Sequence, residues 1–266
     1  MHLVRNSLVA AALWLTTAGT PSAQTARGNP NLGEIGRVEF ELRRWRSDLV
    51  SELRLSDSGV PGTTVDAPDD LGFPAERTWD YHFLIRLSSR LKARGNWFKV
   101  VYDGQATPVD ELCIGGLCTP AGSELSSGLE LEMVQAGVEF DVLHGNYGFV
   151  AVVGEYARFD MRPSFDSSAG SVTPLPEQIQ LPLFGVKGRV YLTPALAVSV
   201  EGVGMKRQSE GVMTDFDASA TYNMVKNLAV SYGYRNSYNR FTPLETTGDR
   251  GTVRLRGQYF SVIVRF

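Results

Sequence analysis

The stretch that decides the fold is the end of the chain, YFSVIVRF at residues 259–266. Every second residue in it is apolar and large, and these four are Phe260, Val262, Val264 and Phe266. Between them stand Ser261, Ile263 and Arg265. Because successive side chains of a β-strand point to opposite faces, this period of two predicts a strand with one strongly apolar face.

The same period recurs upstream. Apolar residues take one face and charged or small residues the other in five further segments: residues 37–43, 184–192, 196–201, 215–222 and 228–235. A soluble β-sandwich also alternates in this way, with its polar face in water. Long segments favour a transmembrane barrel instead, since a strand that crosses a bilayer needs about 9–11 residues. We therefore expect the apolar face to meet lipid and the polar face to line a lumen.

Composition narrows the class of protein. The 266 residues carry a net charge of -3 and are 43% hydrophobic. This hydrophobic fraction is too low for a helical membrane protein and too high for a disordered chain. No segment carries a basic stripe, so we expect no nucleic acid partner. The 13 Phe, 10 Tyr and 4 Trp suit strands and membrane interfaces.

The first residues predict a signal peptide. Arg5 supplies a positive charge, and LVAAALWLTTA (residues 8–18) is an apolar run too short to span a bilayer. Polar sequence rich in Gly, Pro and Asn follows at once, which argues against the alternative of a buried N-terminal helix. We interpret residues 1–23 as the signal peptide, 24–33 as a periplasmic segment and 34–266 as the barrel.

The pattern predicts an all-β, antiparallel up-and-down barrel of about ten strands, with eight or twelve as alternatives. The expected strands are 35–56, 76–89, 93–113, 117–142, 145–161, 178–192, 195–207, 212–222, 228–239 and 252–266. Short periplasmic turns are expected at 90–95, 143–146, 193–195 and 223–227, and long outer loops at 56–75, 161–177 and 239–251. The first strand changes phase between Leu42 and Leu49, which we interpret as a β-bulge.

The final strand resembles the recognition signal of outer-membrane barrels, which the barrel assembly machinery reads; Phe260, Val262, Val264 and Phe266 carry this resemblance. Further segments resemble a loosely defined group of bacterial outer-membrane β-barrel proteins: GTTVD (62–66), DDLG (69–72), VYDG (101–104), YLTP (191–194) and VSYGYR (230–235). The resemblance implies a barrel in the outer membrane, in contact with its lipid and lipopolysaccharide. It implies no substrate, cofactor or catalytic residue.

Cys113 and Cys118 are the only cysteines, and they flank a Gly-Gly pair typical of a tight hairpin turn. An exported chain meets an oxidising compartment, so we expect a disulfide at the tip of a long hairpin above the membrane. A metal pair is the alternative, but neither His nor further Cys lies nearby in the sequence. We therefore expect no metal site.

Charged residues recur on the predicted inward faces of the strands. They are Arg37, Glu39, Glu41, Arg43, Glu139, Asp141, Arg158, Asp160, Lys187, Arg189, Asp215, Asp217 and Arg235. Side chains normally fill a barrel of this size, and mixed charges in a confined space neutralise one another. We expect a charge network that includes Asp215, Asp217 and Arg235. The alternative is a narrow conduit for ions or small solutes.

His82 shares an inward face with Asp80, and both are expected near the outer rim opposite Asp215 and Asp217. A His–Asp pair facing an Asp pair could activate a water molecule. The arrangement is loosely similar to the omptins, ten-stranded surface proteases, although the surrounding motifs do not match. Lipid-modifying barrel enzymes need a lipid-facing His, whereas His82 is expected to face the lumen.

Two function classes follow. The first is a non-enzymatic outer-membrane barrel with a structural, surface-binding or narrow channel role. The second is a rim-active hydrolase, either an omptin-like protease or a lipid-modifying enzyme. The sequence contains none of the motifs G-x-S-x-G, H-E-x-x-H or a phosphate-binding glycine loop. The first class is therefore favoured, with no cofactor, no assigned catalytic residue and the oligomeric state left open.

Overall fold

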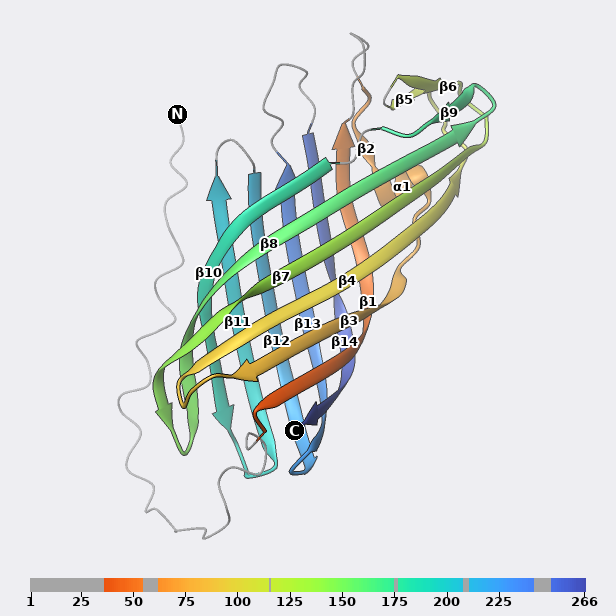
Figure 1. Ribbon diagram of the computed structural model, residues 1–266. Coiled ribbons are helices and arrows are strands. Elements are labelled where there is room, and N and C mark those ends of the chain that lie inside the picture. Colours follow the sequence, from red (N-terminus) through yellow and green to blue (C-terminus); the bar gives the residue numbers. More distant parts are fainter. Residues whose placement is uncertain (1–35, 55–61, 115, 175–176, 208–210, 242–249) are drawn as a thin grey trace, which may run out of the picture.

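The computed structural model describes residues 36–54, 62–114, 116–174, 177–207, 211–241 and 250–266. Within them the chain forms a closed antiparallel barrel of ten long strands (Figure 1). These strands are β1 (Val38–Arg54), β3 (Glu76–Arg86), β4 (Leu91–Ala106), β7 (Leu125–Gly145), β8 (Gly148–Ser167), β10 (Glu177–Tyr191), β11 (Leu196–Arg207), β12 (Gly211–Val225), β13 (Leu228–Phe241) and β14 (Arg250–Arg265). Each pairs with the next in the chain, and the pairing of β1 with β14 closes the ring. The expected strand number and topology are confirmed.

The two ends of the barrel differ. At one end lie four short turns, of which the connection between β7 and β8 has only two residues. The chain also ends there, where the amide of Phe266 donates to the Val38 carbonyl (2.9 Å). Short turns and the terminus mark the periplasmic end. The predicted first turn is displaced, because β3 ends at Arg86 and β4 begins at Leu91.

The long connections and all the small elements lie at the opposite, outer end (Figure 1). The small elements are β2 (Val65–Asp66), α1 (Ala67–Leu71), β5 (Leu112–Ile114), β6 (Leu117–Thr119) and β9 (Gly170–Val172). In the described residues no helix is long and apolar enough to cross a membrane. The predicted signal peptide and residues 24–33 lie outside the described residues.

Strand β7 reverses its polarity halfway along its length. From its periplasmic end to Val134 the outward side chains are apolar, whereas from Glu132 to its outer end they are polar or small. The inward side chains do the opposite: Asp141, Glu139 and Gln135 are followed by Met133, Leu131, Leu129 and Leu125. The periplasmic end of β7 therefore has the polarity of a membrane strand, with apolar side chains outward, and its outer end has the polarity of a strand in a soluble protein, with apolar side chains inward.

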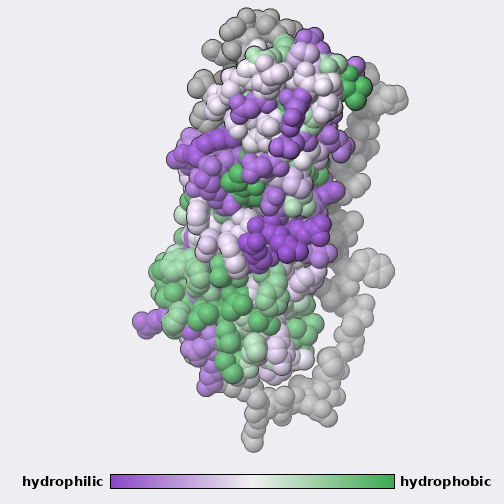
Figure 2. All heavy atoms as spheres, turned by 90° about the vertical axis from the view of Figure 1, so that its right-hand side faces the viewer, coloured by the Kyte–Doolittle hydropathy of each residue, from purple (hydrophilic) through white to green (hydrophobic). Residues whose placement is uncertain are grey.

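The reversal runs around the barrel and divides it into two parts. We call the part on the periplasmic side the membrane half (residues 134–145 on β7) and the part beyond it the outer half (residues 125–133). Figure 2 shows hydrophobic residues gathered over the lower part of the molecule and hydrophilic ones above them. The prediction that the apolar face meets lipid holds for the membrane half only. In the outer half the apolar face turns inward, as in a protein core.

The predicted bulge in the first strand is wrong for this reason. β1 keeps one register against β14 from Glu39 to Arg54, and against β3 from Val38 to Ser47. Leu42 faces outward in the membrane half, whereas Leu49 faces inward and is 6% exposed. The phase of the apolar residues changes because the surroundings change, while the strand itself is regular.

In the part of the chain that the structure describes, two segments cover the outer mouth. Ala67 and Leu71 of α1, with Phe73 after it, are buried against the apolar residues of the outer half. Backbone packs directly on backbone here, since a Cβ at Gly104 of β4 would lie 2.1 Å from the Leu71 carbonyl oxygen. The second segment is the separate hairpin of β5 and β6, from which Leu112 and Ile114 are buried in the same cluster.

Candidate functional site

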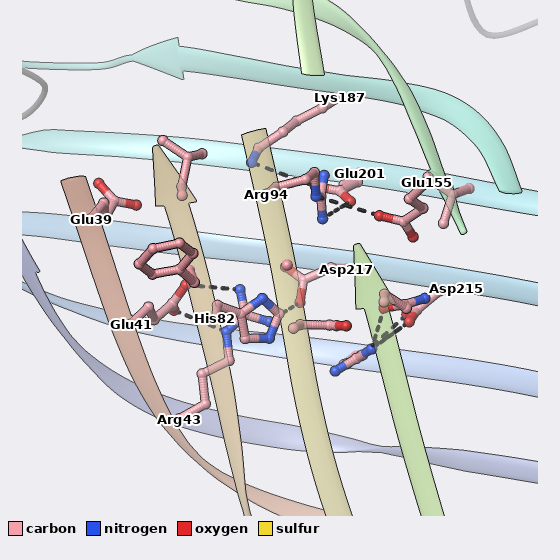
Figure 3. A pocket seen from close by; sticks show the side chains of 17 residues that line it. Glu39, Glu41, Arg43, His82, Arg94, Glu155, Lys187, Glu201, Asp215 and Asp217 are labelled. Carbon is pink, nitrogen blue, oxygen red and sulfur yellow. Dashed lines mark hydrogen bonds and ion pairs between the residues drawn. The ribbon is translucent and has the colours of Figure 1, made fainter. Parts of the chain in front are cut away.

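The lumen of the membrane half holds a dense network of charged side chains (Figure 3). They reach inward from β1, β3, β4, β8, β10, β11, β12 and β13. A cavity of about 70 Å³ remains between them. A space of this size holds a few water molecules, because one water needs roughly 10–15 Å³ of such volume.

Arg235 joins the residues that were predicted to face one another. Its Nη2 lies 2.5 Å from Oδ2 of Asp215, and its Nη1 lies 2.7 Å from Oδ2 of Asp80. The same Asp80 oxygen is 2.8 Å from Nε2 of His82. Arg235 is 2% exposed and Asp80 is fully buried. The His–Asp pair and the Asp pair do meet, but a guanidinium lies between them.

Arg43 makes the second junction. Its Nη1 is 2.7 Å from Oδ2 of Asp217, and its Nε is 3.0 Å from Oε1 of Glu41. Tyr259 donates to the other oxygen of Asp217 at 2.9 Å, and Ser261 donates to Glu41 at 2.6 Å. Both carboxylates therefore have charged and neutral partners.

Basic residues nearer the periplasmic end complete the network. Arg94 Nη2 lies 2.6 Å from Glu201, and Arg94 Nε lies 3.4 Å from Glu155. Lys92 Nζ lies 2.7 Å from Glu139 and 2.9 Å from Asp141. Since each carboxylate here lies beside a cation, the lumen holds few uncompensated charges.

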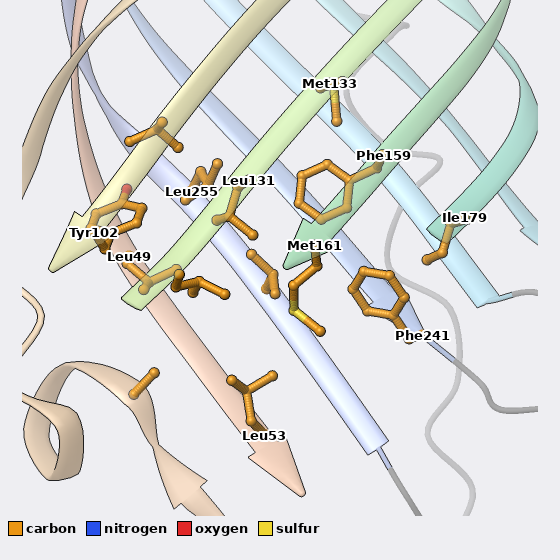
Figure 4. Close-up of a cluster of buried hydrophobic side chains, with 14 of the residues drawn as sticks. Leu49, Leu53, Tyr102, Leu131, Met133, Phe159, Met161, Ile179, Phe241 and Leu255 are labelled. Carbon is orange, nitrogen blue, oxygen red and sulfur yellow. The ribbon is translucent and has the colours of Figure 1, made fainter. Parts of the chain in front are cut away.

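Aromatic rings close the network on its outer side. The guanidinium carbon of Arg235 lies 5.4 Å from the Trp45 ring centroid and 5.1 Å from that of Phe98. Both rings are fully buried. Beyond them the lumen is filled by a cluster of buried apolar residues (Figure 4). The labelled members of this cluster are Leu49, Leu53, Tyr102, Leu131, Met133, Phe159, Met161, Ile179, Phe241 and Leu255.

The prediction that His82 and its partners lie near the outer rim is wrong. They lie beneath Trp45 and Phe98, and the apolar cluster separates them from the outer end. Arg158 and Asp160 were expected in the lumen, but both share the outward face of β8 with Tyr156. The polarity reversal explains this error, because outward residues of the outer half are polar.

Several members of the network escaped the sequence analysis. Lys92 and Arg94 were assigned to a turn, although they are inward residues of β4. Glu155 is isolated among apolar inward residues of β8, so alternation did not single it out. For Lys92 and Arg94, the alternation with Ala93 and Gly95 was the available signal.

The cysteines are joined as a disulfide, Cys113–Cys118. They come close to Glu111 in a group of potential metal ligands, but disulfide sulfurs are not thiolates and leave no metal site there. The expectation that they staple the tip of one long hairpin is wrong, since β4 ends at Ala106 and the cysteines lie in the small β5–β6 hairpin. That hairpin instead covers the mouth.

The C-terminal residues lie in the seam of the barrel. Phe260, Val262 and Phe266 are exposed on the outward face of β14, and Val264 is directed the same way. β14 pairs with β13 on one side and with β1 on the other. Its apolar residues therefore belong to the lipid-facing belt at the point where the ring closes.

Known structures share this fold. The crystal structure of the outer membrane protease OmpT from Escherichia coli matches with a TM-score of 0.56 at 8% identity, over 86% of this chain and 96% of that chain. At this identity the likeness shows the fold alone. The barrel geometry and the apolar belt together make the protein an outer-membrane β-barrel.

Weaker likenesses extend to barrels with other roles. The attachment invasion locus protein Ail of Yersinia pestis has a TM-score of 0.33 at 9% identity, over 85% of this chain and 99% of that chain. The outer membrane protein AlkL, solved in DMPC bilayers, has a TM-score of 0.33 at 14% identity, over 94% and 98% of the two chains. Scores this low carry no argument about function. No protein-family model and no curated protein matches the chain.

Proposed function

We propose that the protein is a non-conducting outer-membrane barrel that presents its outer half as a rigid binding surface outside the cell. The single observation that carries this proposal is the filled lumen. Ion pairs centred on Arg235 and Arg43 fill the membrane half, and packed apolar side chains fill the outer half. A barrel with a filled lumen has no path for solutes, so its role is to hold the outer half in place outside the cell.

A channel role needs a continuous path for water. The 70 Å³ cavity lies beneath Trp45 and Phe98, which are 0% exposed. Above them Leu131 and Phe159 are also fully buried. Apolar constrictions exclude water and ions even where a thin gap remains. These observations favour a closed barrel over a conduit.

A hydrolase role needs a base that can reach a substrate. His82 shares a hydrogen bond with Asp80, and the Asp80 carboxylate is also bound by Arg235. Arg235 occupies the same carboxylate oxygen as His82, and the Trp45 and Phe98 rings above block the approach of a substrate from the outer side. The proposed function therefore assigns no catalysis to these residues.

We further propose two partners for the lipid belt. Lipopolysaccharide is the proposed neighbour of the outward surface where the belt meets the outer half. The barrel assembly machinery is the proposed partner during biogenesis, through Phe260, Val262, Val264 and Phe266, which line the seam strand. Neither proposal requires the lumen to open.

Planar bilayer recordings test the proposed function. Purified mature protein, inserted at a density verified by gel mobility, is expected to give no discrete current steps, while a general porin in the same bilayer does. Regular steps of a single size from the wild-type protein would contradict the proposal. Arg235→Ala is expected to stay silent as well, because the apolar cluster above it is unchanged.

A further inference from the structure

Five arginines gather on the outside of the barrel, just beyond the lipid belt. They are Arg44 and Arg46 of β1, Arg77 of β3, and Arg254 and Arg256 of β14. We call this set the arginine face. β1 pairs with both β3 and β14, so the five side chains stand on three adjacent strands.

The arginine face is directly continuous with the belt. Arg44 is opposite Trp79 on β3 and opposite Phe260 on β14. Trp79 and Phe260 are exposed apolar residues, and the Arg44 guanidinium carbon lies 4.9 Å from the Trp79 ring centroid. Figure 2, which faces the right-hand side of Figure 1, shows strongly hydrophilic residues directly above the hydrophobic region. The cations thus lie at the level where lipid headgroups begin.

These cations have little compensation within the protein. Arg46 stands directly opposite Arg77, an arrangement of like charges that destabilises a sheet. Arg46 has one acidic neighbour, Asp48, at 3.8 Å, and its side chain is 66% exposed. Arg254 donates to the neutral amide of Asn236 at 2.7 Å. Among the described residues, neither Arg77 nor Arg256 has an ion pair, and the single carboxylate of Asp48, which stands opposite Arg256, is shared with Arg46.

The adjoining wall of the outer half, formed by β4, β7 and β8, provides a contrast. Lys99 lies 2.8 Å from Glu130, Arg162 lies 2.5 Å from the same carboxylate, and Arg158 lies 2.8 Å from Asp160. These exterior cations on β4 and β8 are therefore neutralised by carboxylates of the chain itself. Those on β1, β3 and β14 are left available to an external anion.

We propose that the arginine face binds the phosphate groups of an anionic glycolipid in the outer leaflet, with the acyl chains lying on Trp79 and Phe260. Guanidinium groups bind phosphate through paired hydrogen bonds and are favoured for this purpose. The continuity with the belt favours a membrane lipid over a soluble polyanion. A groove that continues outward from Arg254 is lined by Tyr238, Arg240, Thr252 and the carboxylate of Glu52, and it gives room for headgroup sugars.

This proposal specifies the lipid neighbour named under the proposed function, but it does not depend on the closed lumen. The two can fail separately, because conductance reports on the lumen and lipid affinity reports on the exterior. A conducting barrel with an intact lipid site would contradict only the proposed function.

The test measures binding of diphosphorylated lipid A to mature protein refolded in neutral detergent without lipopolysaccharide. Native mass spectrometry gives the dissociation constant. The variant Arg46→Gln, Arg77→Gln, Arg256→Gln is expected to bind about 10- to 100-fold more weakly, since each cation near a lipid surface contributes about 1 kcal/mol. The control is Arg158→Gln, Arg162→Gln, which removes two exterior charges from β8, a strand not paired with β1, β3 or β14, and is expected to bind as the wild type does.

Three further arms complete the design. The variant Arg46→Lys, Arg77→Lys, Arg256→Lys keeps the charge and is expected to retain most of the affinity, which separates lost charge from faulty folding. Dephosphorylated lipid A is expected to bind the wild type as weakly as phosphorylated lipid binds the glutamine variant. Equal affinity of the glutamine variant and the wild type would overturn the proposal, as would an equal loss in the control. Displacement of the lipid by inorganic phosphate at the same concentration would overturn the assignment to a lipid.

Discussion

Arg235 and Asp80 stand 155 residues apart in the chain, yet Nη1 of the arginine lies 2.7 Å from Oδ2 of the aspartate across the lumen. β13 and β3, which carry them, are separated in the ring by β14 and β1. The contact therefore ties together two parts of the barrel wall that share no backbone hydrogen bonds. Trp45 and Phe98 shield it from the outer side, so the pair is buried and each partner depends on the other for compensation of its charge.

Replacing Arg235 with Ala leaves Asp80 and Asp215 without their shared cation. Removing one partner of a buried ion pair costs about 3–5 kcal/mol, because the remaining charge is uncompensated. We expect a clear fall in the temperature at which the folded form is lost in detergent, measured by heat-modifiable gel mobility.

The matched control for that change is Arg254→Ala, which removes an arginine from the outer surface. Arg254 lies on the outward face and is only half-buried, and a surface substitution of this kind changes stability by about 0.5 kcal/mol or less. If Arg235→Ala were as mild as Arg254→Ala, the lumen network would have to be wet, and the filled-lumen account would lose its main support.

A second prediction concerns the packing of apolar side chains inside the outer half. Phe159 is fully buried there, so Phe159→Ala is expected to cost about 3–5 kcal/mol through the lost contacts and the cavity left behind. The comparison is Arg162→Ala on the outward face of the same strand, which is expected to have little effect. Urea titration of both variants, followed by near-ultraviolet circular dichroism, distinguishes a packed interior from a water-filled one.

A third prediction concerns the disulfide and the β5–β6 hairpin that covers the outer mouth of the barrel. Cys113 and Cys118 close a short loop, for which the lost chain entropy amounts to about 2 kcal/mol. Replacing both with Ser is expected to loosen the β5–β6 hairpin and leave the barrel intact. Limited proteolysis should then cut residues 107–124 faster, while the gel mobility of the barrel stays the same. Unchanged cleavage would mean that packing of Leu112 and Ile114 suffices to hold the cover.

Deleting Phe266 tests the role predicted for the chain end. The residue is 73% exposed, and its amide donates to Val38 where the ring closes. We expect less inserted barrel in cells, with unchanged thermal stability of the fraction that does insert. The measurement compares the folded and unfolded bands in outer-membrane fractions. A normal yield would show that the assembly signal lies elsewhere.

The alternation of side chains carried most of the fold prediction. On β14 and β13 the residues facing lipid and lumen could be assigned correctly, because Phe260, Val262 and Tyr232 contrast with Ser261 and Arg235. The number of strands, and the alternation of short turns at one end with long connections at the other, followed from the spacing of turn residues. Strand faces and turns depend on residues that are close in the sequence, so a sequence pattern is enough to predict them.

Two of the errors share one physical cause. Alternation reports two faces, but it does not say which face is inside, and in this protein the answer changes along each strand. Leu49 suggested a bulge, and Arg158 suggested a lumen charge, because one environment was assumed for the whole strand. The pairing of Arg235 with Asp80 also escaped prediction, since it depends on distances across a closed ring.

The most direct test of the account is the accessibility of spin labels along β7. Single cysteines placed at Val138, Val134, Glu132 and Glu130 sample the outward face, and cysteines at Leu131 and Met133 sample the inward face. We predict that Val138 and Val134 are accessible to oxygen dissolved in lipid, that Glu132 and Glu130 are accessible to a water-soluble nickel reagent, and that both inward sites are protected from each. Lipid exposure continuing to Glu130, or a water-accessible label at Leu131, would contradict the reversal of polarity and with it the closed barrel.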